Sequence, residues 1–179
     1  MSVTTSELRR FRADKDRVFA SDPHSPLTAD QRRDFQGLEY FDENPQLVIH
    51  ASIDRGVDPE EVRMGTSSGE EQVYHRYGLV RFQVDDQPAQ LTLYSSEDSD
   101  ELFVPFRDAT SGHDTYGAGR YLEVEAHGDH VTIDFNYAYN PNCAYDSAWS
   151  CPLPPTENWL KVPIRAGEKT FAAGHEATS

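Results

Sequence analysis

The sequence predicts a mainly β protein: an antiparallel barrel-like or sandwich domain with two short N-terminal helices. Two observations support this prediction. In the first 37 residues the apolar positions recur at helical spacing, whereas after Leu38 apolar and polar residues alternate with a period of two. Seven or eight short alternating runs then follow one another, separated by turn residues rather than helical segments, which is typical of antiparallel barrels and sandwiches.

The first predicted helix covers residues 6–20. Its apolar side chains fall near one face: Leu8, Phe11, Val18 and Phe19. Pro23 ends this helix, because the residue before a proline is disfavoured in the α conformation. A second short helix is expected to begin at Thr28, where Gln31 completes a capping box. We expect the charged side chains of both helices to face solvent.

The predicted strands are short and alternate in polarity. Asp85 to Pro88 form a turn between two of them, which predicts a hairpin, and His127 to Asp129 form another turn. A last strand is expected after a proline-rich stretch. The predicted strands are residues 47–54, 74–84, 89–94, 102–106, 122–125, 131–139 and 160–165.

Length and composition predict one domain over residues 1–179. A helical segment (1–37) would pack on a β domain (38–171), and residues 1–5 and 172–179 would be frayed. No apolar run approaches the ~20 residues that a membrane span requires. The first residues lack the apolar core of a secretory signal, so we expect a cytoplasmic protein with no membrane partner.

The charge balance is strongly acidic. Asp and Glu number 31 against 16 Lys and Arg, for a net charge of −15, and only three of the basic residues are lysines. Such a surface repels itself in dilute salt and is tolerated in concentrated salt, where the Debye length is ~3 Å at 1 M. We therefore expect a salt-accumulating, halophilic cytosol, with an ordinary acidic protein as the alternative. Nucleic acid is excluded as a partner because phosphate binding needs a basic surface.

The glycine-rich run from Asp108 to Tyr121 is the first candidate site. It joins two predicted strands and leads into no helix, so it is neither a Walker loop nor a dinucleotide fingerprint. Three interpretations stay open. The loop is structural, with Arg120 bonded to a buried carboxylate; it binds a polar ligand; or Ser111 is the nucleophile of a hydrolase, beside His113.

The second candidate lies between Asp134 and Asn158. Asp134 and Asn136 share one face of a predicted strand, where they either line a cavity or face water. Three interpretations of Cys143 and Cys151 stay open. They are inert thiols or form a disulfide, both bind a metal, or one of them is a nucleophile. Trp149, Trp159 and Tyr145 are core residues or stack on a ring. No motif indicates a particular cofactor, and the oligomeric state stays open.

Several runs resemble an uncharacterised domain-of-unknown-function family of bacteria and halophilic archaea. The resemblance covers roughly residues 6–171 and implies no agreed activity. The most specific runs are Thr115-Tyr-Gly-Ala-Gly-Arg120 and Cys151-Pro-Leu-Pro-Pro155. The other runs that carry the resemblance include Asp134-Phe-Asn136, Tyr139-Asn-Pro-Asn-Cys-Ala-Tyr145, Glu157-Asn158 and Arg165-Ala-Gly-Glu-Lys169.

These observations predict binding of a small polar ligand or metal in the C-terminal half of the chain. A hydrolase or transferase that uses Cys143 or Ser111 is the alternative, and a protein-interaction module is the second. Cys143 and Cys151 are the candidate metal ligands. The candidate ligand-binding residues are Thr110, Ser111, Tyr116, Arg120, Asp134, Asn136, Asn140, Tyr145, Glu157 and Asn158.

Overall fold

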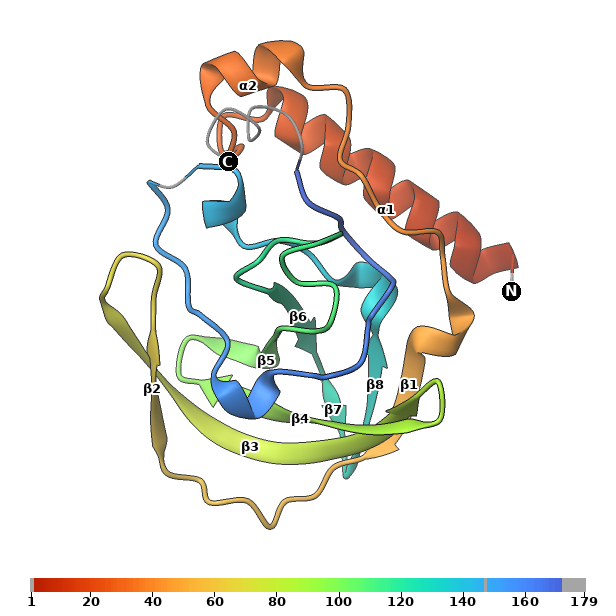
Figure 1. Cartoon of the computed structure of the whole chain (residues 1–179), viewed down its shortest axis with the longest axis vertical. Coiled ribbons are helices and arrows are strands. Elements are labelled where there is room, and N and C mark those ends of the chain that lie inside the picture. The colour runs from red at the N-terminus through yellow and green to blue at the C-terminus, as the bar shows by residue number, and fades with distance from the viewer. Residues whose placement is uncertain (1, 147, 172–179) are drawn as a thin grey trace.

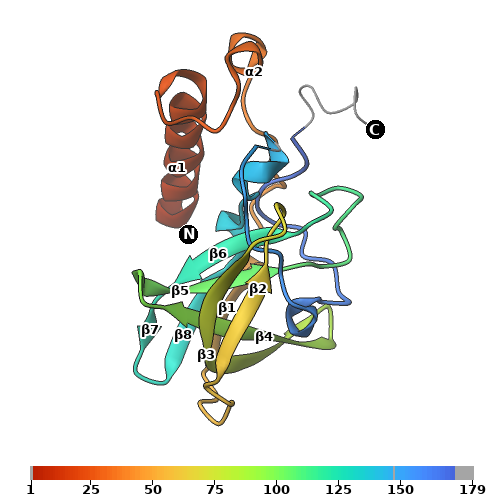
Figure 2. The same ribbon diagram turned by 90° about the vertical axis from the view of Figure 1, so that its left-hand side faces the viewer.

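The structure, a computed structural model, describes residues 2–146 and 148–171. Two antiparallel sheets face each other, and two helices lie outside them (Figures 1 and 2). The helices are α1 (Ser2–Ser21) and α2 (Ala29–Asp34), with the short 3-10 helices η1 (Pro45–Leu47), η2 (Phe135–Tyr137), η3 (Asn142–Ala144) and η4 (Thr156–Asn158). The strands are β1 (Val48–Ser52), β2 (Glu61–Gly65), β3 (Glu71–Val84), β4 (Gln87–Ser96), β5 (Ser99–Phe106), β6 (Arg120–Val124), β7 (Ala126–His127) and β8 (His130–Asp134).

The larger sheet has five strands in the order β2-β3-β4-β5-β6, all antiparallel neighbours in sequence. The β3–β4 hairpin closes through Asp85 and Asp86, whose φ values are +50° and +66°. Two successive residues with positive φ give a turn whose twist matches that of the flanking strands, so this pair fixes the hairpin register. The smaller sheet has the order β1-β8-β7, with Val48 opposite Asp134 and Ser52 opposite His130.

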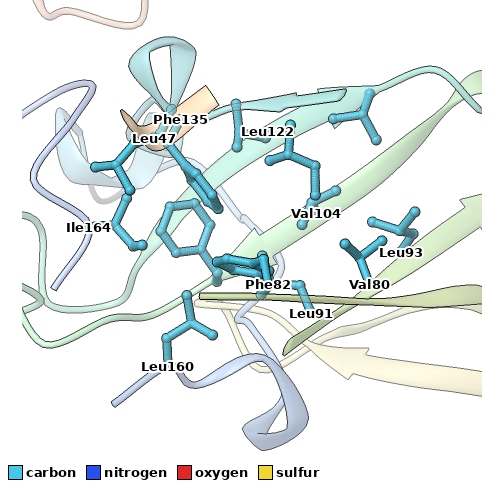
Figure 3. Close-up of a cluster of buried hydrophobic side chains, with 14 of the residues drawn as sticks. Leu47, Val80, Phe82, Leu91, Leu93, Val104, Leu122, Phe135, Leu160 and Ile164 are labelled. Atoms are coloured by element: carbon cyan, nitrogen blue, oxygen red, sulfur yellow. The ribbon is translucent and has the colours of Figure 1, made fainter. Parts of the chain in front are cut away.

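The two sheets bury their apolar faces against each other, and the arrangement is a sandwich rather than a closed barrel. Val80, Leu93 and Val104 of the larger sheet and Ile133 of β8 are all fully buried in one cluster. Phe135 and Ile164 extend this cluster beyond the strands (Figure 3). The last part of the chain therefore completes a core that the strands leave open.

Helix α1 docks on the sandwich by a face that is both apolar and charged. Leu8 and Phe19 are buried. Arg12 donates from Nη1 to the carbonyl of Phe41 (3.2 Å), and Asp16 accepts from the backbone amide of Leu38 (3.0 Å). The expectation that all helix charges face solvent is wrong for these residues, because carbonyls and amides of the segment after α2 satisfy them.

Of the remaining predictions about helices and strands, some are confirmed and several are wrong. The Thr28–Gln31 capping box of α2 is confirmed in both of its hydrogen bonds. The predicted strand 131–139 ends at Asp134, because Asp134 caps η2 and turns the chain. The predicted strand 160–165 is absent from the sheets, and β2 lies where no strand was predicted. Helix α1 is 20 residues long rather than short and begins at Ser2, within the predicted frayed segment. The predicted tail, 172–179, lies outside the described residues. None of the described helices is long and apolar enough to cross a membrane.

Candidate functional site

Arg120 is at the centre of a buried network within the protein. Its side chain is 0% exposed; Nη2 donates to the Asp108 carboxylate (3.4 Å) and to the Ile164 carbonyl (2.8 Å), and Nη1 donates to the carbonyls of Glu168 (3.2 Å) and Ala166. Burial lowers the pKa of Arg120, and the adjacent Asp108 carboxylate opposes this shift. Arg120, a candidate ligand-binding residue, is therefore bonded to a carboxylate and carbonyls of the chain itself, as in the structural interpretation of the loop.

The glycine-rich loop folds around the same carboxylate. Thr110 donates to Asp108 Oδ2 from its hydroxyl (2.8 Å) and its amide (3.3 Å), and the amide of Ile164 donates to that oxygen (2.6 Å). Ser111 donates to Asp108 Oδ1 (3.4 Å) and accepts from the Asp108 amide (3.1 Å). Among the hydrogen bonds of the described residues, Ser111 has no histidine partner. Thr110, Ser111 and Arg120 thus come together, and their polar atoms hold the C-terminal segment.

Asp134 and Asn136 serve a second, separate junction. Asp134 Oδ1 accepts from the amide (3.0 Å) and the side chain (2.9 Å) of Asn136. Asn136 in turn bonds both the amide (2.8 Å) and the carbonyl (3.0 Å) of Asn44. These side chains join the chain before β1 to the chain after β8.

The side chain of Asn158 bonds backbone groups of the larger sheet, as a neighbouring strand would. Its side-chain oxygen accepts from the amide of Thr92 (2.8 Å), and its side-chain nitrogen donates to the carbonyls of Thr92 (3.0 Å) and Pro105 (2.9 Å). The preceding Glu157 accepts from Nε of Arg76 at 3.2 Å to each carboxylate oxygen, and from the hydroxyl of Tyr94. Burial, followed by this hydrogen bond, raises the pKa of Tyr94 well above its usual value.

Asn140 and Tyr145 converge on a residue absent from the predicted set, Glu168. Glu168 is 1% exposed; Oε1 accepts from the Asn140 amide (3.1 Å) and the Tyr145 hydroxyl (2.6 Å), and Oε2 accepts from Lys15 of α1. Burial, then the negative charge of Glu168, raises the pKa of Tyr145 far above its usual value. Lys15 could have been noticed in the sequence, since it is one of only three lysines and lies four residues from both Phe11 and Phe19.

The two cysteines are free, buried, and packed with aromatic residues. Cys143 accepts a hydrogen bond from the hydroxyl of Tyr116 (3.7 Å), and Tyr121 completes the cluster. Burial raises the pKa of Cys151 to about 11. Within residues 2–146 and 148–171, no three His, Cys, Asp or Glu side chains are grouped so that they could hold a metal ion.

A groove of about 710 Å³ lies between the β3–β4 hairpin and the segment that contains η4. Its lining comprises buried apolar residues, such as Phe82 and Leu160, together with the exposed cations Arg81 and Lys161. Trp159 lines it as well and is 48% exposed. The lining residues are Arg81, Phe82, Gln83, Pro88, Ala89, Gln90, Thr156, Glu157, Trp159, Leu160 and Lys161.

The rim of this groove is locally basic in an acidic protein. The guanidinium of Arg107 lies over the Trp159 ring, with its central carbon 4.4 Å from the ring centre, and the indole nitrogen donates to the Pro154 carbonyl (2.9 Å). Arg81 pairs with Asp54 at 3.1 Å. The groove contains Glu157 from the predicted set, whereas Arg81 and Lys161 were missed because hairpin and loop residues meet only in the fold.

Comparison with known proteins identifies relatives of the whole chain. A family model described as "Protein of unknown function (DUF1684)" matches residues 33–169. The solution NMR structure of an uncharacterised protein from Haloarcula marismortui is similar, with 38% sequence identity and a TM-score of 0.73. The alignment covers 96% of this chain and 97% of that chain. No curated protein matches.

Proposed function

The chain belongs to the DUF1684 family of proteins of unknown function, and we propose that it binds a small anionic ligand in the groove between the β3–β4 hairpin and η4. The observation that supports this proposal is the gathering of Arg81, Lys161 and the Arg107–Trp159 pair around one concave surface with an apolar floor. The lining comes in about equal parts from the β3–β4 hairpin and from the C-terminal segment that contains η4, so only part of the groove lies in the C-terminal half predicted from the sequence.

The charges favour an anion over a cation. Glu157 is the one carboxylate among the lining residues, and it is already held by Arg76 and Tyr94. Lys161 is exposed, and no described acidic side chain lies within ion-pair distance of its ammonium group. A carboxylate or phosphate group can therefore approach Lys161 without displacing an existing ion pair.

The floor favours a ligand with an apolar part. Phe82 and Leu160 are each 9% exposed, the highest value in the main core cluster, so this cluster reaches the surface at the groove. Small-molecule sites combine such an apolar surface with a few convergent polar groups, and their volumes fall in the range of roughly 300–1,000 Å³. A ring bearing an acidic group matches both features, because Trp159 can contact the ring while Lys161 contacts the acid.

The experiment uses Trp159 as the reporter. Trp149 and Trp159 are the two tryptophans, so the variant Trp149→Phe leaves Trp159 as the only indole. Phenyl phosphate should change its fluorescence saturably, whereas benzylammonium, which carries the same ring with the opposite charge, should not. Binding should weaken as salt rises, because the charges are exposed.

A pair of charge-matched variants locates the site. Lys161→Gln should weaken phenyl phosphate binding by roughly tenfold, which corresponds to about 1.4 kcal/mol. Arg17→Gln removes one positive charge from the exposed surface of α1 and should leave binding unchanged. Equal affinities in the two variants, or an equal response to both probes, would argue against this groove as the site.

We further propose that the protein works in the concentrated salt of a halophilic cytoplasm. The net charge of −15, the scarcity of lysine and the 38% identity to a protein of a halophilic archaeon support this proposal. The melting temperature should rise between about 0.1 M and 2 M KCl as exposed carboxylates are screened. The same melting temperature at both salt concentrations would contradict the proposal.

A further inference from the structure

The ammonium group of Lys15 lies between a carboxylate and two aromatic rings, and we call these surroundings the Glu168 recess. Lys15 Nζ donates to Glu168 Oε2 and lies 4.9 Å from the ring centre of Tyr139 and 5.5 Å from that of Phe19. A carboxylate combined with aromatic faces is the arrangement that proteins use to recognise ammonium ligands. Glu168, Asn140, Tyr145 and Tyr139 lie outside α1, whereas Phe19 is part of the helix.

The carboxylate of Glu168 requires a cation. The Glu168 side chain is 2% exposed and the Lys15 side chain 16% exposed. An ionised carboxylate left alone at such depth is strongly unfavourable, because its hydration is lost and nothing replaces it. Departure of Lys15 therefore requires that another cation enters or that the carboxylate takes up a proton, which favours a cation that can replace the ammonium group.

The recess also has hydrogen-bonding capacity that Lys15 does not use. Within the described residues, three of the four buried polar side-chain atoms without a hydrogen-bond partner belong to residues around Glu168. They are Oδ1 of Asn140, the hydroxyl of Tyr40 and Nε of Arg12. Asn140 is 2% exposed and donates its amide to Glu168, Tyr40 pairs with Glu168 in an isolated bridge, and Arg12 stacks on Tyr40 at 4.3 Å. Buried polar atoms normally find a partner. Asn140 and Tyr40 lie outside α1, so their unpaired atoms mark a place for a polar molecule that remains when the helix leaves.

Among the described residues, the hydrogen bonds that attach α1 to residues 38–171 come from side chains of the helix. Arg12, Lys15 and Asp16 make them, and no backbone ladder joins α1 to a sheet in the described part of the chain. Figures 1 and 2 show the helix lying outside the two sheets. The family match begins at residue 33, after α1 and within α2. Departure of α1 would therefore leave every sheet hydrogen bond intact.

We propose that the Glu168 recess is a receptor for a primary ammonium group, that Lys15 occupies it in this state, and that a small amine with a neighbouring hydroxyl group displaces helix α1. The hydroxyl group both donates and accepts, so it can serve Asn140 Oδ1 and the Tyr40 hydroxyl. This site is separate from the anion groove, and the two proposals stand or fall independently.

The test compares ethanolamine with choline, its N-trimethyl derivative, on the wild-type chain. Both are cations with the same hydroxyl group, but only ethanolamine has the N–H donors that Glu168 needs and the small head that fits. Hydrogen exchange of the amides in residues 8–19 should accelerate severalfold in ethanolamine and not in equimolar choline, whereas the β3–β4 amides should be unchanged. Equal exchange of residues 8–19 in the two solutions would overturn the proposal.

Two variants locate the effect. Lys15→Met leaves Glu168 unpaired, so ethanolamine should raise its melting temperature more than choline does. The double variant Lys15→Met with Glu168→Gln has neither charge and should respond equally to both compounds. A preference for ethanolamine that persists in the double variant would place the amine elsewhere and overturn the assignment to Glu168.

Discussion

The carboxylate of Asp108 and the guanidinium of Arg120 form an ion pair in which the side chains are 1% and 0% exposed. Asp108 also accepts from the amide of Ile164, and Arg120 donates to its carbonyl. Ile164 lies in no strand. Its backbone amide and carbonyl therefore bond two charged side chains instead of a neighbouring strand. The pair organises the C-terminal segment of the chain.

Removing one charge of this pair should destabilise the fold strongly. Asp108→Asn leaves the Arg120 charge buried without a counter-ion, and we expect the free energy of unfolding to fall by roughly 3–5 kcal/mol. The matched control is Asp14→Asn, which breaks an exposed pair with Arg17 on α1 and should change stability by at most about 0.5 kcal/mol. Urea unfolding measures both. Similar losses in the two variants would show that the buried pair contributes little.

A methyl group at Gly119 should be far more harmful than one at Gly128. Both residues have positive φ (+108° and +62°), where an L side chain costs roughly 1–2 kcal/mol. At Gly119 the added Cβ would also lie 2.5 Å from the Phe106 carbonyl oxygen, whereas at Gly128 nothing lies within 4 Å. Gly119→Ala should therefore lose roughly 1–3 kcal/mol more than Gly128→Ala. Thermal unfolding of the pair tests this, and equal melting temperatures would contradict it.

The buried tyrosines should make alkaline unfolding steep. Burial is the main cause that raises the pKa of five tyrosines above the unfolded value of 10.0. The five are Tyr40, Tyr94, Tyr121, Tyr139 and Tyr145. A raised folded pKa means that the unfolded chain loses protons first as pH increases. The stability from each group is fully present below pH 10.0 and falls above it by about 1.4 kcal/mol per pH unit.

Absorbance near 295 nm, which reports phenolate, should thus rise together with unfolding rather than before it. Circular dichroism recorded in parallel supplies the control for folding. Phenolate formation by these tyrosines near pH 10 in a chain that is still folded would contradict the burial argument.

The thiol of Cys151 should react slowly in the native protein. Its pKa of about 11, against 9.0 in an unperturbed thiol, lowers the thiolate fraction at neutral pH by roughly a hundredfold. The variant Cys143→Ser isolates Cys151, and a chromogenic disulfide reagent should label it much faster in guanidinium chloride than in buffer. Rapid native labelling would contradict the burial of this thiol.

Local sequence patterns correctly predicted the elements that depend on a few neighbouring residues. The capping box of α2 depends on Thr28 and Gln31 alone, and the β3–β4 hairpin depends on a turn with two aspartates. The strand predicted at 160–165 has the correct burial alternation, since Leu160, Val162 and Ile164 are buried. Its partners, however, are a loop and two charged side chains, and no local pattern distinguishes these from a strand.

The candidate site was harder to predict, because its residues meet only through the fold. Asp134 and Asn136 were assigned to one strand face, but Asp134 caps η2 and Asn136 binds Asn44. The glycine loop holds a carboxylate of its own, which the sequence offered as the structural alternative. Glu168 and Lys15 are 153 positions apart, so their pairing could not be inferred from spacing.

That separation has a consequence for synthesis on the ribosome. Helix α1 is translated well before the acceptor of its Lys15, which follows 153 positions later. The nascent helix must therefore persist in water while its docking surface is still being made. A purely apolar docking face would be prone to aggregate during this interval, whereas Arg12, Lys15 and Asp16 keep the same face hydrated until Glu168 arrives. The charges that hold α1 on the finished protein therefore also oppose aggregation of the unfinished chain.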